Sequence, residues 1–353
     1  MTPPTRTQVF SMTPAAIDAE AINIAARTLQ SGGLVAFPTE TVYGLGANAL
    51  DEEAVKQIFA AKGRPASDPI IVHLHHPLQL PIVALDVPPV ATTLIQHFWP
   101  GPLTLVFRRT PQVPAAVSAG MDTVAVRMPA HPIAQALIKS ADCPVAAPSA
   151  NRFARPSATT AAHVLEDLAG QVDVILDGGP AIIGLESTIL DLTRPQPVVL
   201  RPGGVPLEDL RAFIPDLEVI TKYLQPDETG NLAPGMLVKH YSPRAQLLLY
   251  EGSSHQIMLT TIHQRAQDLI AANKRVGLLL PDSEIPQFAH LPVATFSLGA
   301  DLEAISHNLF HGLRTLDSLG VDVILTHTYP AHGLGAALRD RLIRAAEGHL
   351  ISC

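Results

Sequence analysis

Short apolar runs alternate with helix-forming segments along almost the whole chain, and this alternation restricts the fold more than any other feature. Segments with apolar residues at helical spacing cover 15–30, 51–61, 131–140 and 159–168. Buried strands are expected at 34–37, 70–74, 103–107, 123–128, 143–147, 172–177, 187–192 and 198–201. Strands that alternate with helices are typical of α/β proteins. Residues 1–206 are therefore predicted to form an α/β domain with helices around a large, twisted, mixed β-sheet.

The pattern weakens over 207–244, where a short helix is followed by QPDETGNLAPG, a composition typical of a linker. A second alternation then fills 245–353. Its expected strands are 245–250, 276–281, 294–298 and 321–326, and its expected helices are 254–272, 301–318 and 334–346. This pattern predicts a small, doubly wound, Rossmann-like C-terminal domain.

Composition excludes several classes of protein. The 353 residues fit two domains at about 150 residues each. With 47% hydrophobic and 16% charged residues, the chain is not disordered, and its net charge of −8 does not suit a protein that coats nucleic acid. Cys143 and Cys353 form no CxxC motif, and we find no apolar run of about 18 residues. We therefore expect a cytoplasmic protein without disulfides or a membrane span.

Two loops place polar side chains next to predicted core strands or helices. PTETVYGLG (38–46) follows a strand, and a binding loop is the favoured interpretation; the alternative is a turn capped by Thr39 and Glu40. In KGRPASDP (62–69), glycine and prolines fix the directions of Lys62 and Arg64, a pair suited to phosphate or carboxylate. The alternative for this pair is neutralisation of a helix dipole.

A third loop, APSANRFARPSATT (147–160), offers uncharged donors from Ser149, Asn151 and Ser157 before a predicted helix. The free amides of that helix are suited to an anion, although a plain capped helix start is an equal alternative. Arg127 and Arg201 each end a predicted strand next to a turn.

Standard nucleotide and metal motifs do not account for these loops. The chain contains no GxxxxGK[ST], HExxH or GxSxG, and GLGAAL (333–338) lies too close to the end for a dinucleotide fingerprint. His73, His75 and His76 are close in sequence, but we expect core or ligand contacts there in preference to zinc.

The three loops, in this order, resemble the YrdC-like family in its two-domain form, the L-threonylcarbamoyladenylate synthases. FWPGPLTLV (98–106), TVAVRMP, ESTILDL and LRPGG also occur in family order, and the motifs cover about 15–205. HYSP (240–243) and GLGAALRDRLIRAA (333–346) resemble the linker and C-terminal signatures. Asp340 departs from the pattern, which leads us to expect Asn there.

The resemblance implies an adenylyltransferase that converts L-threonine, bicarbonate and ATP to threonylcarbamoyl-AMP and pyrophosphate. Magnesium would accompany ATP without direct protein ligands. The product would pass to the tRNA-threonylcarbamoyl transferase machinery, which modifies the adenosine beside the anticodon, with at most a weak direct contact to RNA and none to a membrane. The implied domains are a catalytic domain (1–206), a linker or lid (207–244) and a C-terminal domain (245–353).

The resemblance also implies roles for individual residues. The catalytic group would be Lys62, Arg64, Ser149 and Asn151. The L-threonine pocket would use Thr41, His73, Arg127, Ala147 through its backbone, and Ser187. The nucleotide would be held by Arg64, Asp68, Thr123, Ser149, Asn151, Ser157, Arg201, His240 and Tyr241.

Two other functions are open at this point. The first is a YrdC-type RNA-binding module without adenylation activity, against which the negative net charge argues. The second is the carbamoyl chemistry of hydrogenase-maturation enzymes, for which two cysteines are too few to supply zinc fingers.

Overall fold

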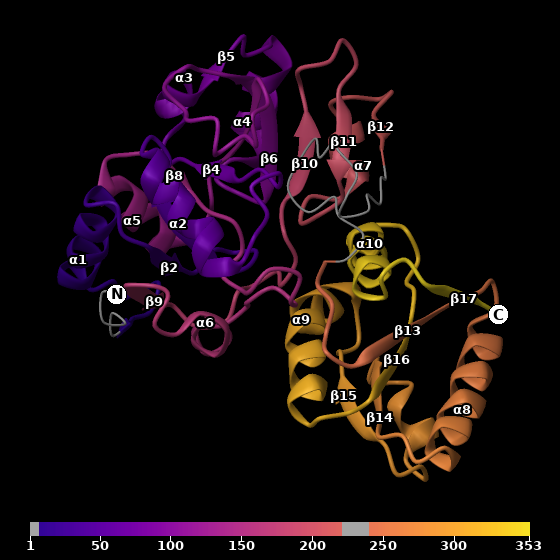
Figure 1. Ribbon diagram of the computed structural model, residues 1–353. Helices are drawn as coiled ribbons and strands as arrows, with labels where there is room; N and C mark the ends of the chain where they lie inside the picture. Colours follow the sequence, from indigo (N-terminus) through magenta and orange to yellow (C-terminus); the bar gives the residue numbers. More distant parts are fainter. Residues whose placement is uncertain (1–6, 221–239) are drawn as a thin grey trace. The chain divides into compact units, whose positions relative to one another are not determined.

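The computed structural model describes residues 7–220 and 240–353, which separate into two compact units. The first unit contains 7–153 and 157–220. The second contains 240–353 together with the short segment 154–156. Each unit is described by itself below (Figure 1).

The first unit is built on a 12-stranded sheet with the order β1-β9-β2-β3-β8-β4-β7-β6-β10-β11-β12, in which β5 also pairs with β6. Both parallel pairs, such as β4 with β7, and antiparallel pairs, such as β6 with β7, occur. The predicted mixed α/β sheet is therefore confirmed. The strands are β1 (Gln8–Ser11), β2 (Val35–Phe37), β3 (Gly44–Asn48), β4 (Ile71–His73), β5 (Ala84–Leu85), β6 (Leu103–Arg109), β7 (Thr123–Arg127), β8 (Val145–Ala146), β9 (Val174–Asp177), β10 (Thr188–Asp191), β11 (Val198–Arg201) and β12 (Glu218–Val219).

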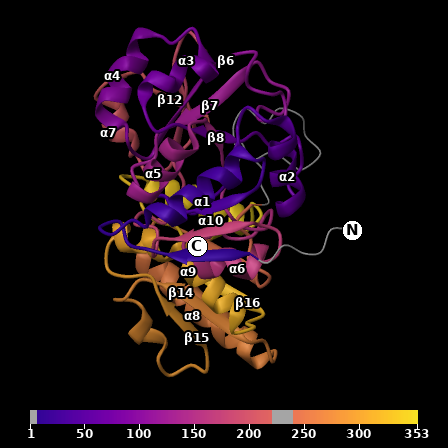
Figure 2. The same cartoon turned by 90° about the vertical axis from the view of Figure 1, so that its left-hand side faces the viewer.

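Two apolar clusters cover the two faces of this sheet. Along β2, Ala36 belongs to the larger cluster, whereas Val35 and Phe37 belong to a second cluster that includes α1 (Ala19–Gln30) and α5 (Pro132–Ala141). This alternation follows from the period of two in a β-strand. Helices α1 and α5 lie side by side in both views (Figures 1 and 2). The other helices are α2 (Glu52–Lys62), α3 (Leu80–Val83), α4 (Pro89–Phe98), α6 (Ala161–Leu168), α7 (Leu207–Arg211) and the 3-10 helix η1 (Pro77–Gln79).

The segment expected to be a linker begins as part of the first unit. The short helix predicted there is α7, and β12 then adds to the sheet by pairing in parallel with β11. Residues 221–239, the rest of the predicted linker before HYSP, lie outside the described residues.

The second unit contains a five-stranded, all-parallel sheet with the order β15-β14-β16-β13-β17. The sheet separates α8 from α9 (Figure 1), because Leu278 and Leu280 of β14 pack with α8 whereas Leu279 lies against Gly312 of α9. The predicted Rossmann-like arrangement is therefore confirmed. Its elements are β13 (Gln246–Glu251), α8 (His255–Ala271), β14 (Val276–Leu280), the 3-10 helix η2 (Ile285–Phe288), β15 (Ala294–Ser297), α9 (Leu302–Ser318), β16 (Val323–His327), α10 (Gly335–Ala345) and β17 (Leu350–Ser352).

The tripeptide 154–156 is held by α9. Nη1 of Arg155 lies 2.8 Å from Oδ2 of Asp317, and Nη2 of Arg314 donates to the Pro156 carbonyl at 2.6 Å. These contacts place the tripeptide in the second unit although it follows Asn151 in the loop after β8.

Buried charges stabilise α10. The Asp340 carboxylate pairs with Nη1 of Arg341 at 2.6 Å and Nη2 of Arg344 at 2.9 Å, and all three side chains are buried. Burial alone would raise the pKa of Asp340, but the two guanidinium groups lower it below its usual range. Within 7–220 and 240–353, no helix is long and apolar enough to cross a lipid bilayer.

Candidate functional site

Three of the residues expected to hold L-threonine, together with Thr104, share one face of the first unit's sheet. His73, Thr104 and Arg127 each lie next to a strand residue that points into the larger apolar cluster, and Oγ of Ser187, just before β10, lies 2.7 Å from Oγ1 of Thr104. Because neighbouring side chains in a strand point to opposite faces, His73, Thr104 and Arg127 emerge on the face away from that cluster. The adjacent core residues are Val72, Leu103, Leu105 and Val126. In β10, Thr188 points to the same face as Leu190 of that cluster.

The loop between β2 and β3 lies against this face because its own hydrogen bonds fold it tightly. Oγ1 of Thr39 accepts from the amides of Thr41 at 3.2 Å and Val42 at 3.3 Å, so Thr39 organises the turn. Gly46 permits close packing, since a Cβ there would lie 2.8 Å from the ring of Phe37. The turn interpretation thus applies to Thr39, while Glu40 and Thr41 are directed to Arg127.

Arg127 and Glu40 form a buried charged pair at the centre of this region. Nη1 of Arg127 donates to Oγ1 of Thr41 at 2.9 Å, and its Nη2 donates to Oε2 of Glu40 at 3.0 Å. Burial lowers the pKa of Arg127, and the charge of Glu40 opposes that shift. Among the described residues, Nε of Arg127 and Oε1 of Glu40 have no hydrogen-bond partner. A buried donor and a buried acceptor therefore remain for a ligand that offers the opposite groups.

His73 lies next to this pair, opposite Arg127 in the register of β4 and β7. Its ring packs edge-on against Phe37 with the centroids 6.3 Å apart. Burial and the nearby charge of Arg127 lower the pKa of His73 to about 3, so the imidazole is neutral at physiological pH. Its Nδ1 has no partner among the residues that the structure describes.

Lys62 joins the end of α2 to the loop after β8. Asp51 caps the start of the helix, and Gly63 ends it in the left-handed conformation with φ 63°. The Lys62 ammonium, although buried, donates to the backbone carbonyls of Ser149 and Asn151. Lys62 therefore fixes the backbone of the loop that was expected to hold the nucleotide.

Arg64 is also buried and is fixed by its own segment. Its Nη2 lies 2.9 Å from Oδ2 of Asp68 and donates to the Pro69 carbonyl at 2.7 Å. Asp68 thus lies inside the protein as the counter-ion of Arg64. Neither cation of the KGRP motif faces bulk solvent.

Ser187 and Arg201 are in direct contact, and Gly203 leaves the space for this contact. Nη2 of Arg201 donates to the Ser187 carbonyl at 2.9 Å, and Oγ of Ser187 lies 2.7 Å from Oγ1 of Thr104. A Cβ on Gly203 would lie 2.3 Å from the carbonyl carbon of Ser187, so only glycine allows this approach. Oγ of Ser157 donates to Oε1 of Glu186 at 2.5 Å beside them.

The remaining predicted residues occupy two further positions. The amide of Ala147 donates to the Ile71 carbonyl at 2.9 Å, so a ligand contact through the Ala147 backbone falls on its carbonyl. Thr123 begins β7 and Arg127 ends it, about 13 Å apart at ~3.3 Å per residue. Pro69, which accepts from Arg64, precedes β4 at the same end of the β4–β7 pair as Thr123. Thr123 and the Arg64 contact therefore lie toward the opposite end of β7 from Arg127, whereas Arg201 lies with Ser187.

Comparisons with known proteins show which family the chain resembles. Residues 27–203 match a family model for Sua5, YciO and YrdC proteins, described as telomere recombination, and 205–347 match the C-terminal domain of threonylcarbamoyl-AMP synthase. A threonylcarbamoyl-AMP synthase of Pyrococcus abyssi is 46% identical over 94% of this chain and 95% of its own length. One from Bacillus subtilis is 42% identical over 93% of each chain.

The chain belongs to the threonylcarbamoyl-AMP synthase family. A crystal structure of P. abyssi Sua5 complexed with L-threonine superimposes with a TM-score of 0.92 at 43% identity, over 99% of this chain and 100% of the other. The family resemblance and the adenylyltransferase class that it implies are thereby confirmed.

Two residues of the family's HYSP motif belong to the second unit. Tyr241, with a φ of 61°, stacks on Phe310 of α9 at 5.1 Å, and the guanidinium of Arg341 lies 5.4 Å from its ring centroid. The His240 ring meets that of Tyr241 edge-on at 4.0 Å. Their predicted contact with the nucleotide stays a prediction.

Sequence reasoning missed several polar partners in this synthase fold. Glu40 was assigned only to the alternative turn, and Glu186 and Thr104 were given no role. Glu40 and Glu186 stand inside the PTETVYGLG and ESTILDL motifs, which was the available signal. The three histidines close in sequence do not act together: β4 ends at His73, and Nδ1 of His76 accepts from the Leu78 amide as the cap of η1.

Proposed function

We propose that this chain joins L-threonine, bicarbonate and ATP to give threonylcarbamoyl-AMP, pyrophosphate and water. The observation that carries the proposal is the buried pair Arg127 and Glu40, each with one polar atom unused among the described residues. An amino acid offers a carboxylate for Nε of Arg127 and an amino or hydroxyl group for Oε1 of Glu40. No simple anion or cation satisfies both atoms.

Threonine first condenses with bicarbonate, forming a carbamate N–C bond and releasing water. One carbamate oxygen then attacks the α-phosphorus of ATP, and the bond from that phosphorus to the bridging oxygen breaks as pyrophosphate leaves. Carbamate and phosphate are both anionic, so the site must reduce their repulsion and stabilise the charge at phosphorus. Lys62 and Arg64 supply buried positive charge next to the Ser149 to Asn151 loop.

We also propose nucleotide contacts from the loop after β8 and from two strand ends. The residues are Ser149, Asn151 and Ser157 of the loop, Thr123 at the start of β7 and Arg201 at the end of β11. We propose that Asp68 acts through Arg64 by fixing the direction of its guanidinium, since the carboxylate is buried against it. Magnesium accompanies the triphosphate as part of the substrate, so we assign it no side-chain ligand. We further propose His240 and Tyr241 as nucleotide contacts, the tRNA-threonylcarbamoyl transferase machinery as the acceptor of the product, and the cytoplasm as the location.

The test measures pyrophosphate release from the full chain with ATP and magnesium while threonine and bicarbonate are omitted in turn. Release that requires both substrates supports the proposal, and release without either one contradicts it. Threonine binding by calorimetry in the absence of ATP tests the Arg127 pocket separately. Salt-sensitive retention of RNA without any pyrophosphate release would instead favour the RNA-binding alternative.

A further inference from the structure

Three potential metal ligands converge in the second unit, at the carboxyl ends of its parallel strands. His255 begins α8 just after β13, Glu284 follows β14, and His327 ends β16. The chain passes from β13 to β14 and β15 and then returns to place β16 between β14 and β13. In open α/β sheets, ligands bind at the carboxyl ends of the strands where the strand order reverses.

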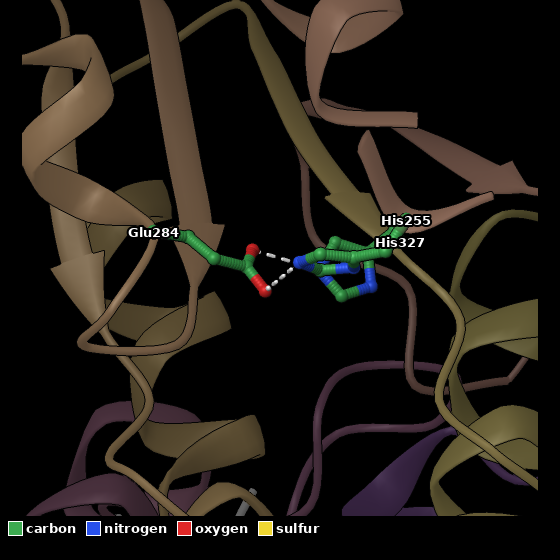
Figure 3. A group of neighbouring side chains, drawn as sticks. All are labelled: His255, Glu284 and His327. Atoms are coloured by element: carbon green, nitrogen blue, oxygen red, sulfur yellow. Dashed lines mark hydrogen bonds and ion pairs between the residues drawn. The ribbon is translucent and has the colours of Figure 1, made fainter. Parts of the chain in front are cut away.

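The three side chains point toward one another (Figure 3). Nε2 of His327 lies 2.8 Å from Oε2 of Glu284, and Nε2 of His255 lies 3.3 Å from Oε1 of the same carboxylate. Three ligand atoms, one from each residue, lie within 4.8 Å of one another. In a tetrahedral zinc site, ligand atoms at about 2.1 Å from the ion are separated by about 3.4 Å. The observed spacings therefore need only small adjustments to enclose such an ion.

The hydrogen bonds of His327 direct its Nε2 at the Glu284 carboxylate. Nδ1 lies 2.8 Å from the Thr328 carbonyl, which only accepts, so the ring proton resides on Nδ1. In the neutral imidazole, the lone pair of Nε2 then faces a carboxylate oxygen of Glu284. That contact is favourable when a proton, on the ring or on the carboxyl group, or a metal ion lies between the two atoms. A backbone carbonyl that fixes the tautomer is the usual partner of a metal-binding histidine.

The group lies on the wall of a cavity of about 560 Å³, within the range of small-molecule sites. Glu284 and His327 are buried at 6% and 3% exposure of their side chains, whereas His255 is 58% exposed and leaves a path from solvent. Tyr329 also lines the cavity, is buried, and among the described residues its hydroxyl has no hydrogen-bond partner. A polar ligand in the cavity would satisfy it.

We propose that His255, Glu284 and His327 bind one divalent transition-metal ion of the zinc class, with its remaining coordination positions open to this cavity. Two imidazoles and one carboxylate suit Zn²⁺ or Co²⁺, whereas Mg²⁺ prefers an all-oxygen shell. The site is separate from the magnesium that accompanies ATP, and it differs from the sequence-based expectation that no side chain ligates a metal.

The test uses the full-length protein, freed of metal with a chelator and dialysed. Titration with ZnCl₂ by calorimetry should give one ion per chain, and CoCl₂ should produce the visible absorption of a tetrahedral or five-coordinate centre. We expect His255→Ala, Glu284→Gln and His327→Ala to weaken zinc binding at least 100-fold. His255→Ala is the decisive variant, because its exposed side chain is not required for packing.

The matched control is His263→Ala. His263 and His290 form another histidine pair in the same unit, with Nε2 atoms 3.0 Å apart, but no carboxylate joins them in the metal-ligand group. This variant should bind zinc as the parent does, and excess zinc should raise the Tm of the parent and of His263→Ala but not of His255→Ala.

Two results would overturn the proposal. One is the absence of stoichiometric zinc or cobalt binding by the folded parent, which would leave the cluster as a hydrogen-bonded group of His327, Glu284 and His255. The other is binding that survives His255→Ala and His327→Ala but disappears in His263→Ala, which would place the ion at the surface pair.

Discussion

Nη2 of Arg127 lies 3.0 Å from Oε2 of Glu40, and both side chains are buried. Replacing Arg127 with lysine should weaken threonine binding at least 100-fold, because an ammonium cannot serve Thr41, Glu40 and a ligand carboxylate with the fixed geometry of a guanidinium. Calorimetry with L-threonine measures this loss. The control is Arg108→Lys, at the exposed position near the end of β6, and this variant should bind threonine normally. Equal affinity in both variants would remove Arg127 from the pocket.

Lys62→Ala should lower kcat for pyrophosphate release by at least 100-fold, since it removes buried charge and frees the carbonyls of Ser149 and Asn151. A loss of about 1–3 kcal/mol in unfolding free energy should accompany it, because those carbonyls lose their donor. Lys56→Ala, on the same helix, is the control: Lys56 makes only exposed ion pairs with Glu52 and Glu53 and should change neither quantity. A normal kcat for Lys62→Ala would contradict the assignment.

Gly203→Ala should destabilise the first unit by about 2–3 kcal/mol, because the new Cβ overlaps the backbone of Ser187 and Thr188. The displaced Ser187 should also lose its bond to Arg201, so KM for ATP or threonine rises. Gly170→Ala is the control for backbone strain without steric overlap. A Cβ there meets nothing within 4 Å, so only the positive φ of 76° costs stability, by about 1–2 kcal/mol. Urea unfolding measures the loss of stability in both variants. Equal losses would show that the backbone around Ser187 shifts to accommodate the new methyl group without further cost.

The low pKa of His73, about 3, predicts a specific pH dependence of stability. The unfolded chain binds a proton at this residue below about pH 6.5, whereas the folded chain does not until about pH 3, so this residue makes stability fall as pH falls through that window. The slope is about 1.4 kcal/mol per pH unit. His73→Asn should therefore lose less stability than the parent between pH 6.5 and pH 5, as measured by urea unfolding. Parallel curves for the two proteins would show that His73 titrates normally.

Asp340→Ala should destabilise the second unit by about 3–5 kcal/mol, because it leaves Arg341 and Arg344 buried without their counter-ion. The pKa of Asp340 is lowered on folding, so its contribution is present above the unfolded value near 4 and is lost as pH falls below it. The variant should thus show a shallower acid dependence than the parent. Asp268→Ala, at an exposed position of α8, should leave the Tm unchanged.

The strands and helices of both units were largely predictable because periods of two and 3.6 are local properties of the sequence. Strand β3 was not, since Gly44–Asn48 contains two glycines and begins inside the 38–46 motif, which predicts a loop. β12 and β17 were missed because they contain two and three residues and depend on pairing with distant strands.

For the site, too, features set by local sequence were predictable and contacts between distant residues were not. Residues such as Lys62 and Arg64 stand in short motifs whose prolines and glycines are visible in the sequence. The partnership of Arg127 with Glu40 joins residues 87 positions apart, and no periodicity shows it. His255, Glu284 and His327 stand outside every motif and meet only because three parallel strands end together.

Arg155 and Pro156 depend on Asp317 and Arg314 of α9, although they come from the loop that follows β8. Severing the chain before β13 would therefore strip the tripeptide of its supports and expose it to water. Truncation to the N-terminal fragment therefore changes two things at once: it removes the C-terminal domain, and it alters the conformation of the loop from Arg152 to Ser157. A change in the fragment's activity could come from either one. Restoring those contacts with a grafted acidic and basic pair would separate the two effects.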